Sequence, residues 1–114
     1  MGFNAHYANI VAAIFIATGQ DPAHVVEGSM GITVARGLAN GDLHFSVYLP
    51  ALLVGIVGGG TKLATQKEAL QILKVGSSQE LAEVLAGAVL AGELSLLASQ
   101  SVGSLAVAHQ KLAR

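Results

Sequence analysis

Residues 79–102 read QELAEVLAGAVLAGELSLLASQSV, and this stretch decides the fold. It predicts one long helix, with Ser78 as a candidate N-cap. A glycine inside a helix costs about 1 kcal/mol relative to alanine. Gly87 and Gly92 therefore indicate that another backbone approaches this helix closely.

The sequence upstream predicts four shorter elements, in the order helix, short helix, β-hairpin and helix. Asn4 is a candidate N-cap for the first helix, and Gly19 is a left-handed stop after it. Asp21-Pro22 opens the short helix, since aspartate suits the N-cap and proline the first helical position. Asn40-Gly41 is a hairpin-turn dipeptide between two segments of alternating apolar residues. The predicted ranges are residues 4–18, 22–28, 31–50 and 63–74, with 51–57 as a buried apolar segment. This order is that of an α+β fold, mainly helical, with one β-hairpin and one long central helix.

The composition indicates that much of the surface faces something other than water. The 114 residues, the size of one domain, are 53% hydrophobic and 11% charged, whereas an average soluble domain has about 25% charged residues. The longest apolar runs, residues 10–17 and 84–92, reach about half of the roughly 20 residues that a membrane span needs. No secretory signal is visible. We therefore expect a cytoplasmic chain in a large protein interface, which leaves open a membrane anchor further upstream.

Charge and residue types exclude several classes of function. A net charge of −1 with six basic residues argues against a nucleic-acid surface, which needs clustered positive charge. The absence of cysteine excludes disulfides, thiolate nucleophiles and sulfur-ligated metals. His24 and His44 lack ligand-like companions, so we predict no metal site.

Three segments, taken in order, resemble one family. They run from Gly2-Phe3-Asn4-Ala5-His6 to Gly19-Gln20-Asp21, from Leu49-Pro50 to Val57-Gly58-Gly59-Gly60-Thr61, and from Ala88 through Gly92-Glu93-Leu94-Ser95-Leu96 to His109. In order and spacing they resemble the large domain of the hydroxymethylglutaryl-CoA (HMG-CoA) reductases, closer to the eukaryotic and archaeal class than to the degradative bacterial one. The resemblance covers essentially the whole chain, and the three motifs in sequence are more specific than any one of them.

The resemblance implies a particular architecture. The family has a large helical domain around a long central helix, a small inserted cofactor-binding domain, and dimers with active sites between subunits. Residues 1–114 would form the C-terminal part of the substrate-binding large domain. The family's catalytic glutamate, its catalytic lysine and its Asp-Ala-Met-Gly-Met-Asn cofactor motif are not in this sequence.

The activity implied is the two-step reduction of HMG-CoA to mevalonate and CoA, with NADPH as the hydride donor. The implied partners are HMG-CoA and CoA, together with a second copy of the chain or the missing upstream half of the enzyme. A different function stays open, that of a non-catalytic truncated module that assembles with a complete reductase subunit.

The resemblance assigns catalytic roles to two residues. Asp21 matches the aspartate that hydrogen-bonds the catalytic lysine and glutamate and tunes their proton affinities. Its local context also suits a plain N-cap before Pro22, and both roles can coexist. His109 matches the histidine that protonates the departing CoA thiolate, which suits an imidazole because its pKa is below that of a thiol. The alternative for His109 is an exposed residue in a tail.

Substrate binding is assigned to His6, Asn9 and Leu96. His6 and Asn9 lie three residues apart, hence on one helix face, where they would present imidazole and amide groups to an anionic substrate. A capping or surface pair is the alternative. Leu96 matches a residue in the apolar wall near the substrate. Glu93, a carboxylate in an apolar helix, needs a buried partner, and we expect structural pairing for it.

Cofactor binding is assigned to Gly58, Gly59, Gly60 and Thr61. They match the family's second glycine motif, which lies against NADPH. Glycine permits positive φ and lets backbone N–H groups approach a phosphate. A flexible turn would use three glycines equally well, so the preceding Leu49-Pro50 segment gives the match its weight.

Overall fold

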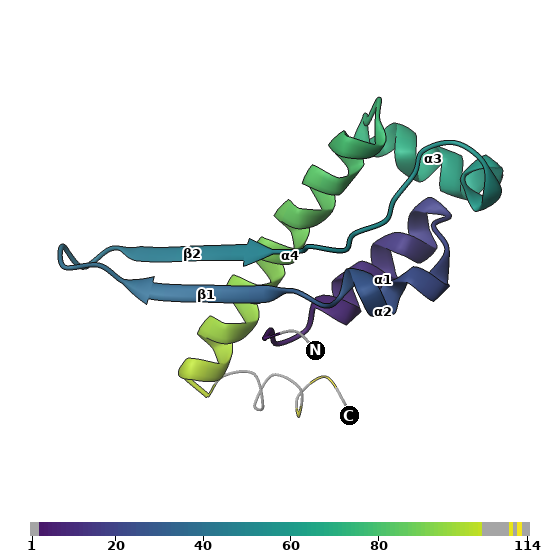
Figure 1. The fold of residues 1–114 in the computed structure, drawn as a ribbon. Coiled ribbons are helices and arrows are strands. Elements are labelled where there is room, and N and C mark those ends of the chain that lie inside the picture. Colours follow the sequence, from purple (N-terminus) through teal and green to yellow (C-terminus); the bar gives the residue numbers. More distant parts are fainter. Residues whose placement is uncertain (1–2, 104–109, 111, 113–114) are drawn as a thin grey trace.

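The computed structural model describes residues 3–103, 110 and 112 of the chain. In this part, the elements follow the predicted order of helix, short helix, hairpin, helix and long helix, which confirms the α+β class (Figure 1). The elements are α1 (Tyr7–Thr18), a 3₁₀ helix (Pro22–His24), α2 (Val25–Gly28), β1 (Ile32–Gly37), β2 (Leu43–Tyr48), a second 3₁₀ helix (Gly59–Lys62), α3 (Ala64–Leu73) and α4 (Ser78–Ser101).

The core lies between the first helix and the last. Tyr7, Val11 and Phe15 recur every four residues on α1 and are fully buried. This spacing places them on one face, where they pack against Leu85 and Val89 of α4. Burying one such side chain contributes about 1.5–3 kcal/mol. The packing of α1 on α4 therefore sets the frame on which the rest of the chain is arranged.

The turn end of the β-hairpin extends away from the helices (Figure 1), whereas Val47 near the other end of β2 packs against the core. β1 and β2 pair in antiparallel register from Ile32 opposite Tyr48 to Gly37 opposite Leu43. The turn holds the predicted Asn40-Gly41 dipeptide, and the Asn40 side chain accepts a hydrogen bond from the Asp42 backbone N–H at 3.0 Å. Large apolar side chains remain exposed on both strands.

The first helix begins at Tyr7, three residues later than predicted. The preceding residues are held by the root of the hairpin instead. Phe3 forms a parallel bridge with Ile32, and the Asn4 side chain donates to the backbone carbonyls of Ser29 and Gly31, each at 3.0 Å. Asn4 still serves the helix start, because its Oδ1 accepts from the Tyr7 N–H at 3.2 Å.

The structure revises two other local predictions. The N-cap of α4 is Ser77, not Ser78, and its hydroxyl accepts from the Glu80 backbone N–H at 3.1 Å. Residues 51–57 form neither helix nor strand. Leu53 and Val57 are exposed, so this segment is only partly buried, whereas a buried segment was predicted.

The glycines of α4 differ from the prediction as well. No atom lies within 4 Å of the position that a Cβ on Gly87 would take. A Cβ on Gly92 would lie 3.1 Å from His6 Nε2 and 3.2 Å from Ile10 Cδ1. Within the described residues, the group that approaches α4 at its glycines is therefore a pair of side chains at Gly92, not another backbone.

α4 is long and apolar enough to cross a membrane, judged by length and composition alone. Glu93 interrupts its longest apolar run, although the helix as a whole remains apolar. A core helix of a water-soluble protein has the same properties. Leu81, Leu85, Val89 and Glu93 of this helix are buried against the rest of the described chain, and most of its other residues are at least partly exposed.

Candidate functional site

The C-terminal end of α1 meets the glycine loop through a contact between two backbones. Gly19 ends the helix in the left-handed conformation at φ 74°, as predicted, and its N–H donates to the Phe15 carbonyl. A Cβ on Gly19 would lie 2.3 Å from the carbonyl carbon and oxygen of Gly60. Only glycine fits there, so this contact places Asp21, two residues on, beside the loop that starts at Gly58.

The side-chain amide of Gln20 also connects the end of α1 to the backbone of Gly55. The Gln20 side chain donates to the Gly55 carbonyl at 2.8 Å and accepts from the Gly55 N–H at 2.8 Å. One side chain thus satisfies both polar groups of a peptide segment that lies outside any helix or strand. Sequence reasoning did not single out Gln20 or Gly55, because nothing local indicates that an amide would meet a glycine 35 residues away.

The glycine loop has two residues in conformations that favour glycine. Gly58 and Gly59 have φ of 82° and 52°, and no atom lies within 4 Å of the position of a Cβ on either. Thr61 is buried, and its hydroxyl donates to the Gly58 carbonyl at 2.5 Å. Glycine at such φ values leaves backbone N–H groups open to a phosphate. The four predicted cofactor residues lie together, and Gly59 is the exposed one among them, whereas the Thr61 N–H is bonded to the Gly58 carbonyl at 3.2 Å.

A cleft of about 860 Å³ lies over this junction. It is lined by residues of the α1 end, the turn after it, the 53–57 segment and the glycine loop, including Asp21, His24, Gly58, Gly59, Gly60 and Thr61. The predicted catalytic aspartate and the predicted cofactor loop therefore border one cavity.

Asp21 is exposed and already has one structural role. Its carboxylate accepts a hydrogen bond from the Ala23 N–H at 2.9 Å, which confirms the predicted N-cap. His24 Nε2 lies 3.6 Å from the other carboxylate oxygen. The Asp21 side chain is 61% exposed, so it remains free to meet a group supplied by another segment.

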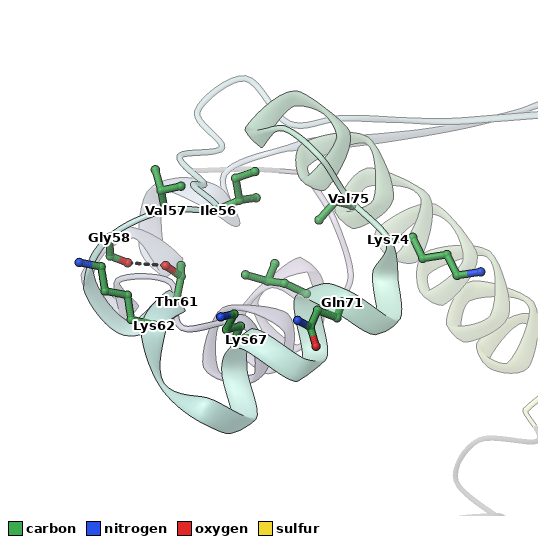
Figure 2. Close-up of a pocket in the computed structure, with 10 residues that line it drawn as sticks. Ile56, Val57, Gly58, Thr61, Lys62, Lys67, Gln71, Lys74 and Val75 are labelled. Atoms are coloured by element: carbon green, nitrogen blue, oxygen red, sulfur yellow. Dashed lines mark hydrogen bonds between the residues drawn. The ribbon is translucent and has the colours of Figure 1, made fainter.

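A smaller cavity of about 360 Å³ lies on the α3 side of the glycine loop. Its walls combine apolar side chains, such as Ile56 and Val75, with Lys62, Lys67 and Lys74. Figure 2 shows the hydrogen bond between Thr61 and Gly58 at one end of it, and the side chains of Lys62 and Lys74 pointing to opposite sides. The diverging ammonium groups do not converge on a single anion.

A polar cluster occupies the other end of α1, centred on Glu93. This side chain is fully buried. One carboxylate oxygen accepts from the Ala5 N–H at 2.9 Å and from Thr33 Oγ1 at 2.7 Å. The other accepts from the His6 N–H at 3.0 Å and lies 2.5 Å from His6 Nδ1. The predicted structural pairing of Glu93 is confirmed, and its partners join α4 to the start of α1 and to β1.

These hydrogen bonds set the charge of the cluster. Burial by itself would raise the pKa of Glu93, but the hydrogen bonds from Ala5, Thr33 and His6 outweigh it and hold the pKa below its ordinary value. Burial also raises the pKa of Tyr7, whose hydroxyl oxygen lies 2.9 Å from Thr33 Oγ1. The Thr33 hydroxyl has one hydrogen, and it donates this hydrogen to the Glu93 carboxylate, which can only accept. In the contact between Tyr7 and Thr33, the Tyr7 hydroxyl is therefore the donor.

The predicted substrate residues are only partly brought together. The imidazole of His6 packs on Gly92 and is 16% exposed, while Asn9 is exposed one turn into α1, with its N–H bonded to the His6 carbonyl at 3.0 Å. Leu96 is half-buried on α4, three residues beyond Glu93. His109 lies outside the described residues.

The two groups of site residues lie at opposite ends of α1. This helix has 12 residues, which corresponds to a length of about 18 Å. His6 precedes it, and Asp21 follows it. A single ligand that contacted both ends would therefore have to span about 18 Å.

We expect Gly19→Ala to destabilise the fold by about 3 kcal/mol, from left-handed backbone strain together with overpacking. Gly41→Ala is the matched control, because Gly41 has φ 89° but no atom within 4 Å of its added Cβ. It should cost only about 1 kcal/mol, from strain alone. Urea unfolding at one protein concentration compares them, and equal losses would refute the backbone contact with Gly60.

The depressed pKa of Glu93 predicts a loss of stability in acid. Its hydrogen bonds contribute fully above the unfolded-state pKa of about 4.3, and this contribution is lost as the pH falls through the lower folded-state value. We expect Glu93→Gln to be less stable at pH 7 yet less sensitive to pH in this range. Urea unfolding between pH 7 and pH 3 measures both, and identical acid dependence in the two proteins would contradict the assignment.

Comparison with known proteins supplies the family. The sequence profile described as hydroxymethylglutaryl-coenzyme A reductase matches residues 1–114. The chain belongs to the hydroxymethylglutaryl-coenzyme A reductase family. It is 58% identical over 117 residues to the 3-hydroxy-3-methylglutaryl-coenzyme A reductase of Methanocaldococcus jannaschii, and that match covers 100% of this chain and 29% of the relative.

Other reductases of this name match at similar levels. The protein of Methanothermobacter thermautotrophicus is 56% identical over 117 residues, covering 100% of this chain and 29% of the relative. That of Catharanthus roseus is 52% identical over 123 residues, covering 99% of this chain and 20% of the relative. The chain thus spans less than a third of the length of these relatives, and both archaeal and plant reductases are similar to it.

Proposed function

We propose that this chain is the C-terminal part of the large domain of an HMG-CoA reductase, a cytoplasmic enzyme that reduces HMG-CoA to mevalonate and CoA in two NADPH-dependent steps. Family membership supports the reaction class. The observation that carries the proposal further is the contact between Gly19 and Gly60, which places the Asp21 carboxylate on the same cleft as the glycine loop.

In this proposal the chain supplies specific parts of the active site. Backbone N–H groups of Gly58 and Gly59 would hold NADPH, which would supply the hydride for each step. Asp21 supports a catalytic lysine that comes from a segment outside these 114 residues. His6, Asn9 and Leu96 contact the substrate, and His109 protonates the CoA thiolate.

The low charge and the exposed apolar side chains support a large interface with other reductase segments. Ile32, Val34, Leu43 and Tyr48 of the hairpin are 42–63% exposed. Such a surface normally belongs to an interface or aggregates. The same observation favours the second candidate function, a truncated module that assembles with a complete subunit without catalysing the reaction.

A chimera distinguishes the two candidates. This chain would replace the segment that it matches in the M. jannaschii reductase, whose remaining sequence supplies the rest of the enzyme. We expect HMG-CoA-dependent NADPH oxidation near that of the parent enzyme. A folded chimera without this activity would favour the non-catalytic module.

We expect the purified chain alone to have no reductase activity. It lacks the family's catalytic lysine and glutamate, and one general acid–base group contributes about 10²–10⁴-fold to a rate. The assay is NADPH oxidation dependent on HMG-CoA, with the parent M. jannaschii reductase as positive control. Turnover by the chain alone would contradict the proposed sharing of the site.

A further inference from the structure

The hydrogen bonds around Glu93 hold the His6 side chain in one orientation. Each carboxylate oxygen accepts two hydrogen bonds, so Glu93 has no further acceptor site to offer. Two of the four donors belong to His6. The first is its backbone N–H and the second is its ring nitrogen Nδ1, so both the peptide and the imidazole of His6 are fixed by one carboxylate.

The protonation of the His6 ring follows from these contacts. A carboxylate held ionised by other donors can only accept, so Nδ1 of His6 must carry the proton that lies between them. The remaining nitrogen, Nε2, accepts a hydrogen bond when the ring is neutral and donates one when it is an imidazolium. A free imidazole has no such constraint on its tautomer.

Gly92 limits the space on the other side of the His6 ring. A Cβ at Gly92 would lie 3.1 Å from Nε2 and 3.3 Å from Cε1 of His6, closer than ordinary van der Waals contact. Adjacent residues of α4 therefore supply the space for the ring and the acceptor for its Nδ1. The buried contact of α4 with the start of α1 is thereby specific for an imidazole at position 6.

We infer that Glu93 is a positioning residue of the proposed substrate site. Together with Gly92, it fixes the His6 ring with its proton on Nδ1 and leaves Nε2 as the nitrogen that meets the hydroxymethylglutaryl group. That group carries a tertiary hydroxyl and a carboxylate. Nε2 can accept a hydrogen bond from the hydroxyl when the ring is neutral, and it can donate one to the carboxylate when the ring is an imidazolium. The inference rests on the proposed function, since it requires His6 to contact the substrate.

The test uses the chimera with ¹⁵N-labelled histidine and compares it with Glu93→Gln. We expect NMR of the unchanged chimera to place the His6 ring proton on Nδ1. Glu93→Gln should move the tautomer population toward Nε2–H and raise KM for HMG-CoA about tenfold or more, while KM for NADPH changes less than about twofold. Ser77→Ala is the matched control, because it removes the N-cap at the far end of the same helix. It should lower Tm and leave the tautomer and both KM values unchanged.

A second variant keeps the test decisive if Glu93→Gln fails to fold. Gly92→Ala retains the carboxylate and all four donors but pushes on the ring, so it too should raise KM for HMG-CoA selectively. An Nε2–H tautomer in the unchanged chimera, or an unchanged KM for HMG-CoA in both variants, would overturn the positioning role while leaving the proposed function intact. Absence of reductase activity in a folded, unchanged chimera would refute the proposed function, and this inference with it.

Discussion

Asp21→Asn in the chimera should depress turnover of both HMG-CoA and added mevaldehyde by about 10²–10⁴-fold, the contribution of one acid–base group. The reason is that the proposed partner of Asp21, a lysine from another segment, polarises the carbonyl in each reduction step. Loss of the negative charge beside that lysine changes the proton affinity of the lysine in both reduction steps. Steady-state NADPH oxidation with each substrate gives the two values.

The substitution separates catalysis from folding unusually well. Asparagine is as good an N-cap as aspartate, so the hydrogen bond from the Ala23 N–H and the 3₁₀ helix that begins at Pro22 should survive. Asp21→Ala provides the comparison, because it loses both the cap, at about 1 kcal/mol, and the charge. If Asp21→Asn retains nearly full turnover, Asp21 is a structural cap and nothing more.

His109→Gln should depress turnover of HMG-CoA by about 10²–10⁴-fold and affect mevaldehyde much less. Reduction of the thioester gives a hemithioacetal, which expels CoA as a thiolate. An imidazolium that protonates this thiolate prevents it from adding back to the aldehyde. The second reduction has no thiolate to protonate, so the histidine should matter little there.

The comparison of the two substrates decides the role of His109. Asp21→Asn serves as the internal control, since it should lower both activities in the same assays. Equal losses with both substrates in His109→Gln would show that this histidine is not the acid for the thiolate. Unchanged activity with both would mean that the assignment from family resemblance fails at this position.

The sequence predicted the helix ends and turns that depend on residues close together in the chain. Gly19 ends α1 in the left-handed conformation, Asp21 caps the turn at Pro22, and Asn40-Gly41 turns the hairpin. In each case one residue type satisfies a backbone requirement within a few positions. The carboxylate of Glu93 within an apolar helix likewise predicted a buried polar partner, though not its identity.

Long-range contacts explain what the sequence did not predict. The start of α1 was placed too early because Phe3 and Asn4 bind the hairpin root, nearly 30 residues along the chain. The double hydrogen bond of Gln20 to Gly55 and the contact of Gly19 with Gly60 depend on how two segments pack. Such pairs leave no trace in local spacing, although the family's motifs contain all of these residues.

The most direct test of the central claim is complementation between separate polypeptides. One is this chain, and the other is the M. jannaschii reductase without the segment that this chain matches. We expect neither to oxidise NADPH in the presence of HMG-CoA when alone, and the mixture to regain activity that saturates at one chain per partner. Activity of this chain alone would contradict the account, as would a stable complex of the two that remains inactive.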